Sequence, residues 1–214
     1  MSFEVGKKAL DFLIANSGNR RNLEVDFFGG EPLMNWQVVK DLVAYGREQE
    51  KLHDKNFRFT LTTNGVLLND EIMEFCNKEG DDFNFVHFMI DLEGGPCVAK
   101  RLSGCGSGTE YLAVTPWGDF YPCHQFVGNE KFLLGNVDEG IKNTEIRDEF
   151  KCCNVYAKEK CRKCFARFYC SGGCAANAYN FSGDICGAYD IGCELQKKRI
   201  ECAIMIKAAE ADCE

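Results

Sequence analysis

The chain has 214 residues, of which 45% are hydrophobic, and its formal net charge is −8. This composition can build a hydrophobic core, and the acidic balance argues against binding to nucleic acid, which needs a concentrated positive surface. No long apolar run and no signal-peptide layout occur, so we expect a cytoplasmic protein that does not span a membrane.

The first third of the chain alternates predicted helices with predicted strands. Helical spacing of apolar residues covers 3–15, 35–50 and 70–78, and strand-like runs cover 23–28 and 56–62. The order helix, strand, helix, strand, helix predicts parallel strands joined by crossover helices. In sheets of that kind, ligands bind at the carboxyl ends of the strands.

A short turn follows each of the two predicted strands. The first turn is Gly29-Gly30-Glu31-Pro32, where two glycines allow close backbone approach and a carboxylate can accept from a cation. The second turn, Thr62-Thr63-Asn64-Gly65, offers hydroxyl and amide groups. Each turn taken alone also fits an ordinary connection between a strand and a helix, so both interpretations stay open at this point.

Together, GGEP at 29–32 and TTNG at 62–65 resemble the radical S-adenosylmethionine (radical SAM) superfamily. The resemblance implies a partial (β/α)6 barrel, in which the first turn receives the amino group of S-adenosylmethionine and the second turn lies near the same ligand. The cofactor-binding residues that it implies are Gly29, Gly30, Glu31, Pro32, Thr63 and Asn64.

Cysteine dominates the rest of the chain. There are fourteen cysteines, and only Cys76 lies before Cys97. Disulfide-dense scaffolds are usually small and exported, and this larger chain has no export signal, so the cysteines favour metal ligation. We therefore predict an α/β domain at 1–92, ending in a strand at 83–92, and a metal-held domain at 93–214.

The densest group of cysteines is Cys161-x2-Cys164-x5-Cys170-x3-Cys174. Four thiolates at this spacing could hold one zinc ion, or they could be divided between two iron–sulfur clusters. Upstream, Cys105 precedes a predicted β-hairpin over 111–123, which has turn residues at 116–119 and ends at Cys123.

The full pattern C-x12-G-x4-C, C-x2-C-x5-C-x3-C and a later C is similar to the SPASM domain of radical SAM enzymes that modify peptides. Residues 104–116 and 121–128 further resemble the maturases of six-cysteine (SCIFF) peptides. These maturases form thioether cross-links between cysteine sulfur and a backbone α-carbon of a ribosomal, cysteine-rich precursor peptide. Such a reaction also implies an electron donor.

The resemblance implies two auxiliary [4Fe–4S] clusters. Cluster I would take Cys105, Cys123 and Cys174. Cluster II would take Cys161, Cys164, Cys170 and Cys193. Cys186 remains an alternative to Cys193, and Cys97 remains a possible fourth ligand of cluster I. Of the other cysteines, we expect Cys76 to be a small core residue, and Cys202 and Cys213 on a C-terminal helix to be spectators. Cys152 and Cys153 are adjacent, and adjacent cysteines rarely bind one metal together.

Two features depart from the family pattern. The sequence contains no C-x3-C-x2-C motif, which holds the cluster that cleaves S-adenosylmethionine, and only 40 residues separate Gly65 from Cys105. A complete eight-unit barrel takes about 250 residues. We therefore expect an N-terminally truncated, internally deleted remnant of a barrel followed by a SPASM domain, which does not start the radical reaction by itself. The alternative is a cysteine-rich zinc or iron–sulfur module for peptide binding or electron transfer.

Overall fold

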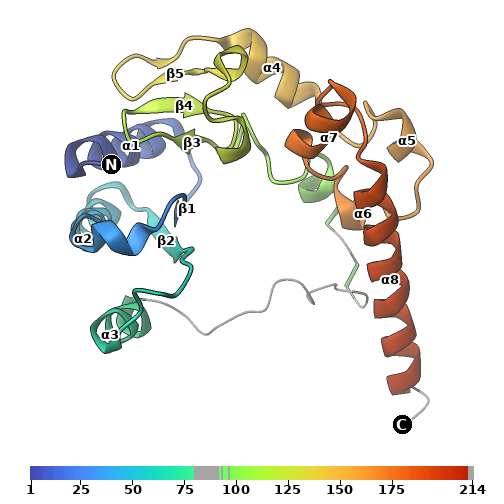
Figure 1. Ribbon diagram of the computed structural model, residues 1–214, viewed down its shortest axis with the longest axis horizontal. Coiled ribbons are helices and arrows are strands. Elements are labelled where there is room, and N and C mark those ends of the chain that lie inside the picture. Colours follow the sequence, from blue (N-terminus) through green and yellow to red (C-terminus); the bar gives the residue numbers. More distant parts are fainter. Residues whose placement is uncertain (80–91, 93, 96, 212–214) are drawn as a thin grey trace. The chain divides into compact units, whose positions relative to one another are not determined.

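The computed structural model describes residues 1–79, 92, 94, 95 and 97–211 (Figure 1). Two compact units are present, and we describe each by itself. The first comprises Met1–Asn84, Val114–Phe120 and Gly135–Lys142; the second comprises Phe85–Ala113, Tyr121–Leu134 and Asn143–Glu214. The strand predicted over 83–92 lies outside the described residues except for Leu92. The predicted boundary at 92/93 stays a prediction.

The first unit confirms the predicted order of helices and strands. Its main elements are α1 (Phe3–Asn16), β1 (Asn22–Phe27), the 3-10 helix η1 (Pro32–Asn35), α2 (Trp36–His53), β2 (Asn56–Leu61) and α3 (Asp70–Glu79). The strands β1 and β2 pair in parallel, with register running from Asn22 opposite Asn56 to Phe27 opposite Leu61. Parallel pairing places both strand ends, and the turns that follow them, at the same edge of the sheet.

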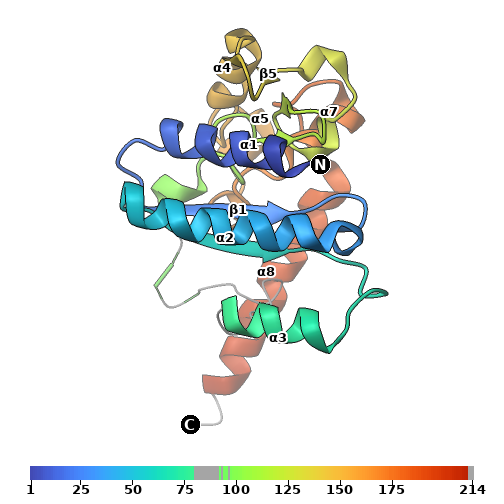
Figure 2. The same cartoon turned by 90° about the vertical axis from the view of Figure 1, so that its left-hand side faces the viewer.

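One face of this two-stranded sheet is apolar and covered by helices. The core contains Leu10 of α1, Leu23 of β1, Leu42 of α2 and Phe57 of β2. Figure 2 shows α2 running along the strands on this face. Gly6 lets α1 approach α2 closely, because a Cβ at this position would lie only 2.5 Å from the Leu42 side chain.

A small sheet in the order β3–β4–β5–β6 completes the elements of this region. The strands are β3 (Ala113–Val114), β4 (Asp119–Tyr121), β5 (Gly135–Asn136) and β6 (Gly140–Ile141). The predicted hairpin is confirmed with shorter strands than expected. Its turn is closed by the Thr115 N–H, which donates to the Asp119 carbonyl at 2.9 Å.

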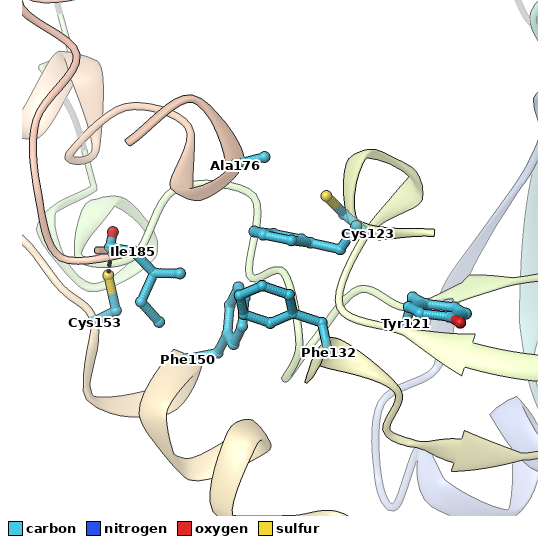
Figure 3. Packing of buried hydrophobic residues seen from close by; sticks show 8 residues of the cluster. Tyr121, Cys123, Phe132, Phe150, Cys153, Ala176 and Ile185 are labelled. Atoms are coloured by element: carbon cyan, nitrogen blue, oxygen red, sulfur yellow. Dashed lines mark hydrogen bonds between the residues drawn. The ribbon is translucent and has the colours of Figure 1, made fainter. Parts of the chain in front are cut away.

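The second unit consists of short helices, one long helix and loops around an aromatic core. Its helices are η3 (Val98–Arg101), η4 (His124–Phe126), η5 (Glu130–Phe132), α4 (Thr144–Cys152), α5 (Glu159–Arg162), α6 (Arg167–Cys170), α7 (Ala175–Ser182) and α8 (Asp190–Ala211). Figure 3 shows part of this core, with Phe132 and Phe150 close together. The rings of Phe126 and Phe132 lie 4.3 Å apart, and Phe150 packs edge-on against both. Cys123 and Cys153 belong to the same core. Among the residues that the structure describes, no helix is long and apolar enough to cross a bilayer.

Candidate functional site

The carboxylate of Glu31 joins the two predicted ligand turns of the first unit. Its Oε1 accepts from the Thr63 hydroxyl at 2.7 Å, and its Oε2 accepts from the Asn64 N–H at 2.9 Å. The Leu33 N–H also donates to Oε1, at 3.0 Å. These hydrogen bonds lower the pKa of Glu31, and the bond from Asn64 has the largest effect, followed by the bond from Leu33. Glu31 therefore links the two turns in addition to any ligand that it contacts.

The backbone of the first turn is open to a ligand. Gly29 and Gly30 have φ values of +92° and +60°, a conformation that favours glycine. Apart from the chain neighbours, no atom of the described residues lies within 4 Å of a Cβ built on either glycine. In the second turn, the Asn64 carboxamide oxygen accepts from the Val66 N–H at 2.9 Å. The structure therefore brings the predicted residues Gly29, Gly30, Glu31, Thr63 and Asn64 together at the strand ends.

In the second unit, the four predicted ligands of cluster II lie close together. Burial raises the pKa of Cys161, whose thiol also interacts with the thiols of Cys170, Cys193 and Cys164. Burial likewise raises the pKa of Cys193, and the neighbouring Asp190 and Cys164 raise it further. These four thiols and that of Cys174 line one cavity of about 820 Å³.

The predicted ligands of cluster I form a second group of thiols. The pKa of Cys123 is raised by burial, and then by the thiols of Cys174 and Cys105. Cys105 is brought into this group by a loop that passes close to the Cys174 loop. A Cβ at Gly104, where φ is +64°, would lie 3.3 Å from the Gly173 carbonyl oxygen. The absence of a Cβ at Gly104 therefore permits this approach.

The loop between Cys170 and Cys174 aims backbone donors at sulfur. Ser171, Gly172 and Gly173 all have positive φ, with values of +58°, +83° and +74°. Burial raises the pKa of Cys170, whereas the N–H groups of Gly173 and Gly172 donate to its sulfur and lower the pKa. Donors of this kind stabilise a thiolate and tune an iron–sulfur cluster.

The donor set fits clusters in two further respects. The Ser171 hydroxyl is buried and has no hydrogen-bond partner among the described residues, and Lys158 is buried beside the same loops. An unpaired buried hydroxyl and a buried cation both suit an anionic group placed among the thiols.

Within the described residues, no three His, Cys, Asp or Glu side chains converge on a single metal ion. In a cubane, each thiolate binds a different iron.

The remaining cysteines take other positions. Cys186 hydrogen-bonds Cys153, and burial followed by this bond raises the pKa of Cys153 to about 12. Cys97 and Cys202 are exposed. The prediction for Cys76 was wrong: it is exposed, because α3 fully buries only Ile72. Cys213 lies outside the described residues.

Sequence reasoning missed two functional features. The link from Glu31 to the second turn joins residues that are 32 or 33 positions apart, and only the parallel register of β1 and β2 brings them together. The buried Lys158 carries no local sequence signal, because it lies among other charged residues that are exposed.

Comparison with known proteins gives a family similarity for a stretch that contains both turns. Residues 8–111, which include both strands and both turns, match the family model described as the Radical SAM superfamily. This stretch, just under half of the chain, is therefore similar to the radical SAM superfamily.

Individual relatives match shorter stretches. One is the radical SAM cyclopropyl synthase TigE from Paramaledivibacter caminithermalis, which is 32% identical over 60 residues, 28% of this chain and 12% of TigE. An uncharacterized protein from Methanocaldococcus jannaschii is 32% identical over 74 residues, or 35% of this chain and 24% of that protein. A second uncharacterized protein, from Archaeoglobus fulgidus, is 32% identical over 99 residues, or 45% of this chain and 24% of that protein. The matched stretches thus span at most about a quarter of the relatives.

Proposed function

We propose that this chain is part of a radical SAM peptide maturase with a SPASM-type domain, which forms thioether cross-links from cysteine sulfur to backbone α-carbons of a ribosomal precursor peptide. The observation that carries the proposal is the gathering of thiols in the second unit, where Cys161 interacts with Cys170, Cys193 and Cys164, and Cys123 interacts with Cys174 and Cys105. We also propose that β1 and β2, with their helices, are the retained part of a (β/α)6 barrel.

Each group of thiols has a defined role in this proposal. Cys161, Cys164, Cys170 and Cys193 would hold cluster II, and their cavity supplies the space. Cys105, Cys123 and Cys174 would hold cluster I with three thiolates, which leaves a position that a thiol of the substrate peptide can fill. When bound, the two clusters supply electron transfer and the positioning of a thiolate.

The turns of the first unit would bind the methionine part of S-adenosylmethionine. Gly29 and Gly30 leave their backbone groups accessible, and the carboxylate of Glu31 holds the second turn at the same strand end. The sequence contains no C-x3-C-x2-C motif, so these 214 residues supply no known ligand set for a cluster that cleaves S-adenosylmethionine. An electron donor would serve the clusters.

The first experiment counts iron and acid-labile sulfide after anaerobic reconstitution. We expect about eight of each per chain, because two cubane clusters are proposed. Replacing Cys105, Cys123 and Cys174 together by Ala should lower both counts to about four. The matched control replaces the exposed Cys76 and Cys202 by Ala and should keep all the iron. Bound zinc without sulfide would contradict the proposal and favour a structural metal module.

The substrate class is tested on the same protein. A cysteine-containing peptide should change the electron paramagnetic resonance spectrum of reduced cluster I, and the same peptide with serine in place of cysteine should not. The effect should disappear in the variant that lacks Cys105, Cys123 and Cys174. A spectrum that responds equally to both peptides would argue against a thiol substrate.

A further inference from the structure

Lys158 is a buried charge in the second unit. Its side chain is 4% exposed, and among the described residues it is the one buried side chain that carries a formal charge. The ammonium donates to the carbonyl oxygens of Ile185, at 3.1 Å, and Gly187, at 3.3 Å. Within the described part of the chain, no carboxylate forms an ion pair with it. Burying an ammonium without an anionic partner is costly, so its position needs an explanation.

The surroundings of Lys158 are the segments that carry the thiols of cluster II. Its carbonyl oxygen accepts from the Cys161 N–H at 3.0 Å, which fixes Lys158 one turn before this ligand. Its aliphatic stem packs beside Gly172, in the loop between Cys170 and Cys174, since a Cβ on Gly172 would lie 3.5 Å from Lys158 Cδ.

We propose that Lys158 is the buried counter-charge of auxiliary cluster II and raises the reduction potential of that cluster. This inference rests on the proposed function. A cubane with four thiolates is anionic, and its reduction adds one electron from the donor without making or breaking a bond. The fixed positive charge of Lys158 stabilises the more negative, reduced state more than the oxidised state. Lys158 thus acts on the cluster through its positive charge, and its side chain does not itself react.

The test isolates cluster II by replacing Cys105, Cys123 and Cys174 with Ala, and then follows its reduction by dithionite in a potential titration monitored by electron paramagnetic resonance. In this background, Lys158→Met should lower the equilibrium constant for reduction about tenfold, which corresponds to about 59 mV for a one-electron couple. Lys158→Arg keeps the charge and should keep the potential near that of the background protein. Lys151→Met removes an exposed charge from α4 and is the matched control, with no shift expected.

Several results would overturn the inference. The first is an unchanged potential in Lys158→Met with full iron and sulfide. If Lys158→Met does not bind a cluster, the Lys158→Arg variant decides between the two explanations. Loss of the cluster in Lys158→Arg as well would mean that the cluster needs the shape of the lysine side chain and not its charge. A background protein without iron and sulfide would overturn the proposed function as well, and this outcome is distinguishable because it appears before Lys158 is changed.

Discussion

The carboxylate of Glu31 is a single side chain that orders two turns at once. It accepts from one N–H in its own turn and from a hydroxyl and an N–H in the next. Charged acceptors make stronger hydrogen bonds than neutral ones, so protonation should loosen both turns. The sequence suggested Glu31 as a site residue. Its partners Thr63 and Asn64 could not be assigned to it, because the contact depends on strand register.

We therefore expect the Asn64 and Leu33 amide resonances to titrate together with Glu31. Because the pKa of Glu31 in the folded protein is lowered from its ordinary value of 4.5, its contribution to stability is present above that value. The contribution is lost as the pH falls through the lower, folded pKa. Nuclear magnetic resonance should show a common midpoint below 4.5, which Glu31→Gln abolishes. A midpoint at or above 4.5 would mean that the link does not form in solution.

The strands β1 and β2 present two chemically different faces. Leu23 and Phe57 are buried beneath the helices, whereas Glu24 and Arg58 on the other face are exposed and form an ion pair at 3.5 Å. The alternation of apolar and polar residues predicted these strands, and it also set the face that packs against the helices. A parallel sheet with a polar face suits the interior wall of a ligand-binding barrel, as in the proposed function.

The extents of some elements were less predictable from the sequence. The predicted helix at 35–50 begins at Trp36 and extends to His53, because Pro32–Asn35 forms a 3-10 turn and Asp54 ends the helix in a left-handed conformation. The error at Cys76 has a similar origin. Helical spacing gives the relative directions of side chains, but the number of neighbours that cover α3 is a property of the tertiary structure.

Packing on the covered face should dominate the stability of the first unit. Phe57 is 2% exposed, so Phe57→Ala should lower the free energy of unfolding by about 3–5 kcal/mol. Arg58→Ala on the next residue removes an exposed ion pair and should cost less than about 1 kcal/mol. Urea unfolding followed by tryptophan fluorescence reports on this unit, because both tryptophans, Trp36 and Trp117, belong to it. Equal losses in the two variants would contradict the assignment of the core.

At the scale of the whole molecule, the two units depend on different interactions. The first has an apolar core between helices and strands, whereas the second combines an aromatic core with two groups of thiols. The number and spacing of the cysteines predicted that two regions of the chain are stabilised by different interactions. The sequence did not predict that the first unit also includes 114–120 and 135–142, because contacts between distant segments leave no local pattern.

Removal of metal should therefore affect the second unit selectively. Without a cluster, the loops that carry Cys161 and Cys170 lose their proposed common partner, and the buried Lys158 lacks the anion that we propose for it. Because metal binding and folding are coupled at such sites, chelation should reduce amide protection over residues 153–193 by at least about tenfold. Residues 3–61 should keep their protection, since their core contains no ligand.

Hydrogen exchange read by mass spectrometry measures both regions in one sample. The Cys202→Ala variant serves as the control, because it removes an exposed thiol and should respond to the chelator as the unaltered chain does. Equal protection of 153–193 with and without metal would show that apolar packing alone maintains the second unit.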